Sequence, residues 1–324
     1  MNRRTLLAAL LGATALAAAP ANAAGYPDKS VTIVVPFVAG GSSDIVGRLT
    51  GQKLGEKLGQ TVIVDNRPGA NGGIGASLVA KAKPDGYTLL VGSIGVYSIN
   101  PALFKDLTYD PARDMDLLTL AVRTPNVLVA SPKFPANTVA ELVDHMKKNP
   151  EKVTFTSSGI GSSDHLTAVL FWQKTGTKGV HVPYKGGAAA MSDMIGGHAD
   201  VSFQNLGAAS AHVKAGRLKI LGVTSEKRHP VFPETPTMAE AGVQDLVVYS
   251  WQAFAAPKGL PKDVTDKLQP ALIAALKDPE VVRKFDEIGF EVVANTPKEF
   301  ADFQAAEVRR WKEVIEKGDI KPES

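Results

Sequence analysis

The sequence contains no cysteine, and this absence excludes several kinds of chemistry. A disulfide bridge, a thiolate nucleophile and a cysteine-ligated metal site are all impossible. A lipid anchor on a cysteine at a cleavage site is excluded as well. Stability must therefore come from packing, and 324 residues of 44% hydrophobic composition can bury a sizeable core.

An excess of one charge sign is also missing. The chain has 36 Lys and Arg residues against 33 Asp and Glu residues. Nothing in this balance favours nucleic acid as a partner, and none is expected. Long apolar runs are absent after the first residues, so the sequence predicts no membrane span downstream.

The single apolar run opens the chain. "MNRR" is followed by "TLLAALLGATALAAAP" and then by "ANA", the basic, apolar and small-residue order of a secretory signal peptide. We expect residues 1–23 to be removed after Ala23 and the mature protein to be exported. Arg3 and Arg4 fit a twin-arginine signal only loosely, so ordinary secretion is favoured.

Strand-like runs alternate with longer helical stretches after the signal peptide, and this alternation predicts an α/β fold with parallel sheets. Strands are expected at 31–35, 61–65, 87–92, 127–131, 153–158, 180–184, 201–205 and 219–224. Helices are expected near 43–58, 73–82, 138–148, 163–174, 187–196 and 207–214, and from 261 onwards.

The mature chain exceeds the usual size of one domain, yet its Pro and Gly clusters form no long polar linker. We therefore expect two lobes that the chain joins through short extended segments, "NVLVASP" and "VVYSWQAFAAP". Lobe 1 is predicted to be discontinuous, with residues 24–126 plus 250–324. Lobe 2 is predicted to span residues 127–249.

Two turns have the composition of an anion site. "PFVAGGSSD", residues 36–44, and "TSSGIGSSDHL", residues 156–166, each lead from a strand through Gly and Ser into a helix. Free backbone N–H groups and the helix dipole favour an anion at such a turn. Ordinary helix capping explains one turn, but two turns that face each other across a cleft could grip a carboxylate from both sides.

"GANGGIG", residues 69–75, offers a competing hypothesis, because it fits the glycine turn of short-chain dehydrogenases. No Y-x-x-x-K follows it, and an exported enzyme would find little nicotinamide cofactor. We interpret it as a tight turn that enters a helix, with Asn71 lining the cleft.

Motifs for catalysis and metal binding are missing. The chain has no G-x-S-x-G nucleophile elbow and no H-E-x-x-H, so no metal and no cofactor are expected. Ser163 and His165 are two residues apart on a starting helix and point to different faces, so His165 is expected to pack or to orient the loop. An exported serine hydrolase stays open as a rival hypothesis.

The order of the motifs carries more information than any one of them. "PFVAGGSSD", "DNRPGANGGIGASLVAKAKPDGYTLLVGS", "SSGIGSSDHL", "VHVPYKGG", "MIGGHADVSFQNL" and "WQAFAAPKGLP" together resemble the solute receptors of tripartite tricarboxylate transporters, also called Bug proteins. The resemblance covers essentially the whole mature chain from Tyr26 onwards.

The resemblance implies a periplasmic binding protein of the two-lobe type II fold, with a ligand cleft between the lobes and no enzymatic activity. It implies a small organic carboxylate as ligand and the transporter's membrane subunits as partner. A membrane sensor is the alternative partner. The receptor is expected to act as a monomer in the periplasm.

The resemblance also implies a set of ligand-binding residues. The two loops supply Phe37, Ala39, Gly40, Gly41, Ser42, Ser157, Gly161, Ser162 and Ser163, and the cleft wall supplies Asn71, Ser93, Tyr184 and Asn205. Gln204 stands where the family commonly has an acid, which disfavours a ligand ammonium. Asp164 would disfavour a multiply charged ligand if it points inward.

Overall fold

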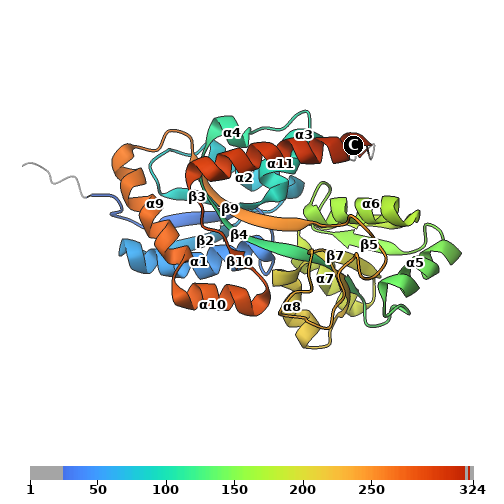
Figure 1. Cartoon of the computed structure of the whole chain (residues 1–324). Coiled ribbons are helices and arrows are strands. Elements are labelled where there is room, and N and C mark those ends of the chain that lie inside the picture. The colour runs from blue at the N-terminus through green and yellow to red at the C-terminus, as the bar shows by residue number, and fades with distance from the viewer. Residues whose placement is uncertain (1–24, 318–319, 322–324) are drawn as a thin grey trace, which may run out of the picture.

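The computed structural model describes residues 25–317 and 320–321 (Figure 1). The expected signal peptide, residues 1–23, lies outside the described residues. Strands and helices alternate along the described chain, as an α/β fold requires. Within these residues, no helix combines the length and the apolar character that a membrane crossing needs.

The described residues form ten strands in one connected sheet system. Eight of them lie in the order β2-β1-β3-β9-β4-β7-β5-β6, while β8 and β10 each pair with β4. Their bounds are β1 Val31–Val35, β2 Val62–Asn66, β3 Thr88–Ser93, β4 Met115–Ala130, β5 Thr154–Ser157, β6 Val180–Pro183, β7 Val201–Asn205, β8 Lys219–Val223, β9 Tyr249–Pro257 and β10 Glu291–Val292.

The sheets are mixed, which differs from the parallel sheets that the alternation predicts. β1 pairs in parallel with β2 and β3, and β5 pairs in parallel with β6 and β7. β9 is antiparallel to both β3 and β4, and β4 is antiparallel to β7 and β8. Strands β4 and β9 carry the chain from one set of strands to the other, and both pair antiparallel with their neighbours.

Strand β4 joins two sheets. Residues 115–125 pair with β9, whereas residues 126–130 pair with β7. The change of partner between Pro125 and Asn126 divides the strands into one set around β1, β3 and β9 and a second set around β5, β6 and β7. The predicted lobe limits themselves stay a prediction.

Helices cover both faces of each sheet. In Figure 1, α1, α9 and α10 lie on one side of the first sheet, and α2 and α11 lie on the other. The helix bounds are α1 Ser42–Leu58, α2 Gly73–Ala80, α3 Asn100–Leu103, α4 Pro111–Asp114, α5 Val139–Lys148, α6 Ser163–Thr175, α7 Gly187–Gly196, α8 Leu206–Lys214, α9 Lys262–Leu276, α10 Pro279–Ile288 and α11 Pro297–Lys317. Two short helical segments, η1 Ala70–Gly72 and η2 Gly95–Ile99, complete the set.

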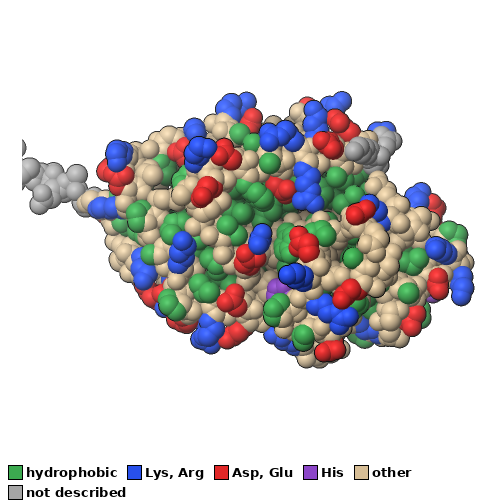
Figure 2. Space-filling model, viewed as in Figure 1, with side chains coloured by type: hydrophobic (Ala, Val, Ile, Leu, Met, Phe, Trp, Pro, Cys, Tyr) green, Lys and Arg blue, Asp and Glu red, His purple; other side chains and the backbone are tan. Residues whose placement is uncertain are grey.

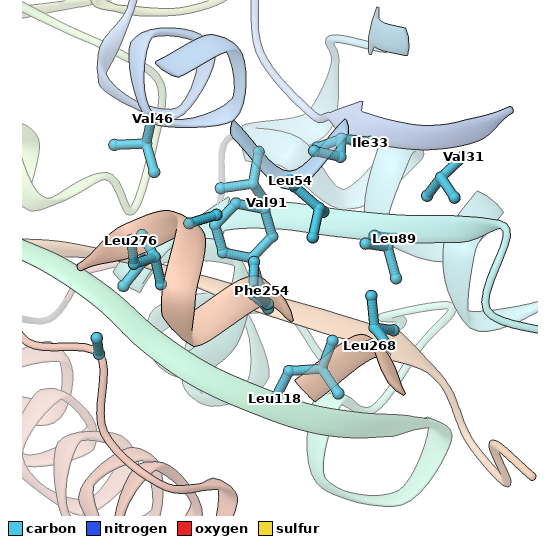
Figure 3. Packing of buried hydrophobic residues seen from close by; sticks show 14 of the residues in the cluster. Val31, Ile33, Val46, Leu54, Leu89, Val91, Leu118, Phe254, Leu268 and Leu276 are labelled. Atoms are coloured by element: carbon cyan, nitrogen blue, oxygen red, sulfur yellow. The ribbon is translucent and has the colours of Figure 1, made fainter. Parts of the chain in front are cut away.

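The core follows from helical and strand periodicity. In α9, Leu268, Leu272 and Leu276 recur every four residues and are fully buried against the sheet. Phe254 of β9 and Ile33 of β1 belong to the same cluster of buried residues (Figure 3). This packing positions β1 and β9 and therefore the loops at their ends.

The surface carries both signs of charge. Figure 2 shows Lys and Arg side chains interspersed with Asp and Glu side chains over the whole visible face. Many of these charges form ion pairs, such as Arg123 with Glu291 at 2.7 Å and Lys53 with Glu280 at 2.8 Å. This face therefore has no large field of one sign.

Candidate functional site

A polar cleft lies where the two sets of strands meet. It holds about 460 Å³ of space that no atom fills, part of it open to solvent. Its walls come from the carboxyl ends of parallel strands, where α/β folds usually bind ligands, and from the start of β9. The lining residues are Phe37, Gly41, Ser42, Ser43, Ser93, Ser158, Ser162, Ser163, Asp164, Gly187, Gln204, Asn205, Ala208, Ser250 and Gln252.

The structure brings together seven of the residues that the sequence nominates. They are Phe37, Gly41, Ser42, Ser93, Ser162, Ser163 and Asn205, and they come from both sets of strands. The other six, Ala39, Gly40, Asn71, Ser157, Gly161 and Tyr184, do not line the cleft. Binding of a ligand by these residues stays a prediction.

The first loop presents an open helix end. Helix α1 starts at Ser42, and its N-cap residue Gly41 has no side chain that could accept a hydrogen bond from the first turn. Gly41, Ser42 and Ser43 all line the cleft. The partial positive charge of a 17-residue helix therefore meets the cleft without a capping side chain.

Asp44 holds this loop from behind. Its carboxylate accepts hydrogen bonds from Gly40 N at 2.9 Å, from Arg48 Nε at 2.9 Å and from Asn66 Nδ2 at 3.0 Å. Burial acts to raise the pKa of Asp44, but these hydrogen bonds outweigh it and hold the pKa below its ordinary value of 3.8. The Gly40 N–H is thus committed to Asp44 and is not free for a ligand.

The polar groups of the second loop form most of their hydrogen bonds within the loop and with the start of α6. Ser162 caps α6 by accepting from His165 N at 3.3 Å, and Gly161 N donates to His165 Nδ1 at 3.1 Å. Ser158 N and Ser158 Oγ both donate to Asp164 Oδ2 at 2.7 Å. The two loops therefore differ: the first offers backbone donors, and the second offers chiefly hydroxyl groups to the cleft.

The remaining nominated residues have partners elsewhere. Ala39 is exposed, and Ser157 is fully buried with its Oγ 2.6 Å from His181 Nε2. Tyr184 Oη donates to Asp193 Oδ2, and Asn71 Nδ2 donates to Asn100 Oδ1 at 2.8 Å. Asn71 sits in a left-handed turn before α2, which is the tight turn into a helix that the sequence predicts.

The structure gives the serine-hydrolase hypothesis no reactive pair in the cleft. Ser163 Oγ accepts a hydrogen bond from Asn205 Nδ2 at 3.4 Å, and His165 is occupied by Gly161. Ser157 and His181 are not among the residues that line the cleft, and burial lowers the pKa of His181 to about 4. His165 orients its loop, as the sequence predicts.

Sequence reasoning missed part of the lining. Six lining residues are not among the expected ligand-binding residues: Ser43, Ser158, Gly187, Ala208, Ser250 and Gln252. The sequence singles out Asp164 and Gln204 for their effect on the ligand but not as ligand-binding residues. Strand β9 held a usable pattern, because Ser250 and Gln252 alternate with the apolar residues Trp251 and Ala253. Polar side chains on one face of a buried strand end indicate a site rather than a core.

Asp164 is the one ionisable side chain among the lining residues. It is 2% exposed, and burial raises the pKa of its carboxyl above the ordinary value of 3.8 despite the hydrogen bonds from Ser158. Gln204 Nε2 also donates to its Oδ2 at 3.3 Å. In the part of the chain that the structure describes, no Lys, Arg or His lines the cleft, so the local field comes from this carboxyl, from hydroxyl and amide dipoles and from the end of α1.

A hydrogen-bonded network connects the walls. Ser42 Oγ donates to Asn205 Oδ1 at 2.8 Å, and Gln252 Nε2 donates to the same oxygen at 3.4 Å. Asn205 Nδ2 donates to Asn126 Oδ1 at 2.7 Å. Side chains from α1, β7, β9 and β4 are therefore linked at one point of the cleft.

Two sheets that share strand β4, with a polar cleft at their junction and an uncapped helix end in it, define a two-lobed solute-binding protein of the α/β periplasmic type. The family model described as tripartite tricarboxylate transporter family receptor, TctC, matches residues 46–320. The chain belongs to this family, a group of periplasmic solute-binding receptors rather than enzymes, and this confirms the family that the motifs predict.

Solved structures of relatives support the fold throughout. The periplasmic binding protein BugD is 36% identical, with a TM-score of 0.88 over 92% of this chain and 100% of its own. R. palustris Rpa4515 with adipate is 35% identical, with a TM-score of 0.89 over 92% and 100%. MatC (Rpa3494) from Rhodopseudomonas palustris with bound malate is 30% identical, with a TM-score of 0.85 over 90% and 100%.

Proposed function

We propose that this receptor captures a small organic carboxylate in the cleft and delivers it to the membrane subunits of a tripartite tricarboxylate-type transporter. The lobes of residues 24–126 with 250–324 and of residues 127–249 close on the ligand. Ligand binding shifts the balance between open and closed forms, because the ligand contacts both lobes only in the closed form.

The open end of α1 is the observation that supports this function most directly. The N–H groups of its first turn and its dipole favour an anion, and Gly41 leaves the approach free of a side chain. Ser163 adds a hydroxyl donor from the opposite loop, because its Oγ accepts from Asn205 Nδ2 and its own proton is not used in that bond. A carboxylate suits these donors, since it accepts several hydrogen bonds without needing a metal or a lysine.

The relatives support the same ligand class. Two of the related structures contain adipate and malate, which are both small dicarboxylates. A receptor for a carboxylate of this size agrees with the lining and with the family.

Calorimetry tests this function. The protein is unfolded, freed of carried-over ligand and refolded, and a panel of mono-, di- and tricarboxylates is titrated into it. We expect saturable binding of at least one small carboxylate. No binding by any member of the panel would contradict the proposal.

Two substitutions at Gly41 give a matched pair. Gly41 has φ −83° and its nearest neighbour lies 3.8 Å from an added Cβ, so Gly41→Ala is expected to fold and bind as before. Gly41→Asp places a carboxylate at the N-cap, which favours the helix yet occupies the position of the ligand. Binding should be lost in Gly41→Asp while the melting temperature is kept.

A further inference from the structure

Two oxygen atoms at the start of β9 are buried in the cleft wall without a partner. Gln252 is 0% exposed and Ser250 is 1% exposed, and both line the cleft. Among the described residues, Gln252 Oε1 and Ser250 Oγ make no hydrogen bond. A buried polar atom left unpaired is costly, so a group that pairs with it on binding contributes strongly to affinity.

The orientation of the Gln252 amide is determined by a chain of hydrogen bonds. Thr167 Oγ1 donates its single proton to the Ser163 carbonyl at 2.6 Å, so it accepts from Asn126 Nδ2 at 2.9 Å. Asn126 Oδ1 then accepts from Asn205 Nδ2, and Asn205 Oδ1 accepts from Gln252 Nε2. Because the chain ends at a carbonyl, which can only accept, the unpaired atom of Gln252 is an acceptor.

The cleft therefore has an acceptor beside its donors. The end of α1 and the serine hydroxyls offer donors for a carboxylate, whereas Gln252 Oε1 requires a donor from the ligand. An unsubstituted alkyl dicarboxylate has no such donor when it is ionised. It would fill the space and leave Gln252 Oε1 buried and unpaired.

We propose that Gln252, with Ser250 beside it, makes this cleft selective for carboxylates that carry a hydroxyl group on their carbon chain. This assignment rests on the proposed function, because it concerns the second polar group of the same ligand. A hydroxyl fits better than an ammonium, since both unpaired oxygens are neutral. The one carboxyl in the lining, Asp164, already accepts three hydrogen bonds on Oδ2, from Ser158 N, Ser158 Oγ and Gln204 Nε2.

Calorimetry with pairs of ligands that differ by one hydroxyl tests the assignment. The pairs are succinate with malate, glutarate with 2-hydroxyglutarate, and propionate with lactate, and aspartate serves as the amino analogue of malate. In the pair that binds, the hydroxylated member should bind at least about tenfold tighter than its partner. Aspartate should bind more weakly than malate.

Two variants assign the preference to β9. Gln252→Met keeps the length of the side chain but removes the acceptor, and we expect it to abolish most of the hydroxyl preference by weakening the hydroxylated member alone. Ser250→Ala, which changes one atom, is expected to reduce the preference and serves if Gln252→Met does not fold. Gln269→Met is the matched control, because Gln269 also donates through Nε2 and has an unpaired Oε1, but it lines a separate cavity.

The outcomes separate the two proposals. No binding by any carboxylate contradicts the proposed function itself. Equal binding of hydroxylated and unsubstituted acids, tighter binding of aspartate than malate, or a preference that survives in both Gln252→Met and Ser250→Ala overturns the assignment and leaves the carboxylate receptor in place. Loss of the preference in Gln269→Met overturns it as well.

Discussion

The imidazole rings of His165 and His181 stack on each other, with their centroids 3.8 Å apart and their planes inclined by 12°. The two side chains come from α6 and β6 and lie directly behind the second loop of the cleft. His165 Nδ1 accepts from Gly161 N, and His181 Nε2 lies 2.6 Å from Ser157 Oγ. The stacked pair therefore supports the loop that carries Ser162 and Ser163.

Stability should fall in mild acid because this pair is neutral in the folded state. Burial, with a smaller effect from His181, lowers the pKa of His165 to about 3, and burial lowers the pKa of His181 to about 4. As the pH falls below 6.5, the two histidines take up protons in the unfolded chain but stay neutral in the folded chain. The free energy of unfolding should therefore decrease from about pH 6.5 down to about pH 4, by roughly 1 kcal/mol per pH unit for each histidine.

Urea denaturation between pH 7.5 and 4.5 measures this dependence. His181→Phe keeps an aromatic ring against His165 but removes one of the two titrating groups. Its free energy of unfolding should be lower at pH 7.5, because Ser157 loses a partner, and should change less steeply with pH. Parallel curves for the two proteins would contradict the assignment.

Asp164→Asn should strengthen the binding of a dicarboxylate. Asp164 is the single ionisable residue among those lining the cleft, so its charge opposes a second negative charge there. We expect Asp164→Asn to bind the best dicarboxylate up to about tenfold tighter at pH 8. Burial raises the pKa of Asp164 above its ordinary value of 3.8, so the affinity of the unchanged protein should approach that of Asp164→Asn as the pH is lowered toward this raised pKa and protonation removes the repulsion.

Isothermal titration at pH 8 and at a series of lower pH values checks this expectation. Asp144→Asn is the control, because Asp144 is exposed on α5 and lies outside the cleft lining. Weaker binding by Asp164→Asn at every pH would show that the ligand needs this carboxylate. A pH dependence of affinity that persists unchanged in Asp164→Asn would contradict the role of the Asp164 charge.

Much of the fold could be predicted, because apolar strands and amphipathic helices are local patterns. Seven of the eight expected strands match observed strands within one or two residues at each end, and the eighth, expected at 127–131, corresponds only to the end of β4. Residues 115–126 mix charged and polar residues with the apolar ones and lack a clean alternation, so the first half of β4 was missed. Strand β9 was expected only as an extended crossing, because its antiparallel pairing depends on β3 and β4 far away in the chain.

Only part of the candidate site could be predicted, because the sequence shows local patterns but not contacts between distant segments. The loop residues Gly41, Ser42, Ser162 and Ser163 follow from strand, turn and helix patterns within each loop. Gln252 enters the cleft only through the pairing of β9 with distant strands. Local spacing also could not show that Gly40 N and Gly161 N are committed to Asp44 and His165.

Asp44→Ala should weaken both stability and binding. The Asp44 carboxylate is buried and accepts hydrogen bonds from Gly40, Arg48 and Asn66, so its removal breaks all three bonds and leaves the Gly40 N–H without this acceptor. We expect the free energy of unfolding to fall by about 1–3 kcal/mol and the affinity to fall with it, since the loop before α1 loses its anchor.

Arg48→Ala should lower the free energy of unfolding by less, because the Arg48 side chain is 53% exposed. Denaturation curves and calorimetry on the two variants compare the effects, and equal costs would contradict this role of Asp44.

Ser42→Ala should lower affinity without lowering stability. Ser42 Oγ donates to Asn205 Oδ1 at 2.8 Å, and the two residues belong to the predicted lobes 1 and 2, so this bond favours the closed form. Asn205 Oδ1 keeps Gln252 Nε2 as a donor when the hydroxyl is removed, which limits the effect on folding. We expect a loss of affinity of about threefold to tenfold, measured by calorimetry, and a free energy of unfolding within ~0.5 kcal/mol of the original.

Two variants serve as controls. Ser42→Thr keeps the hydroxyl and should bind as the original protein does. Ser77→Ala removes a hydroxyl bonded to Thr108 within the same predicted lobe and should leave affinity unchanged. If Ser42→Ala binds as tightly as the original protein, this bond does not contribute to closure.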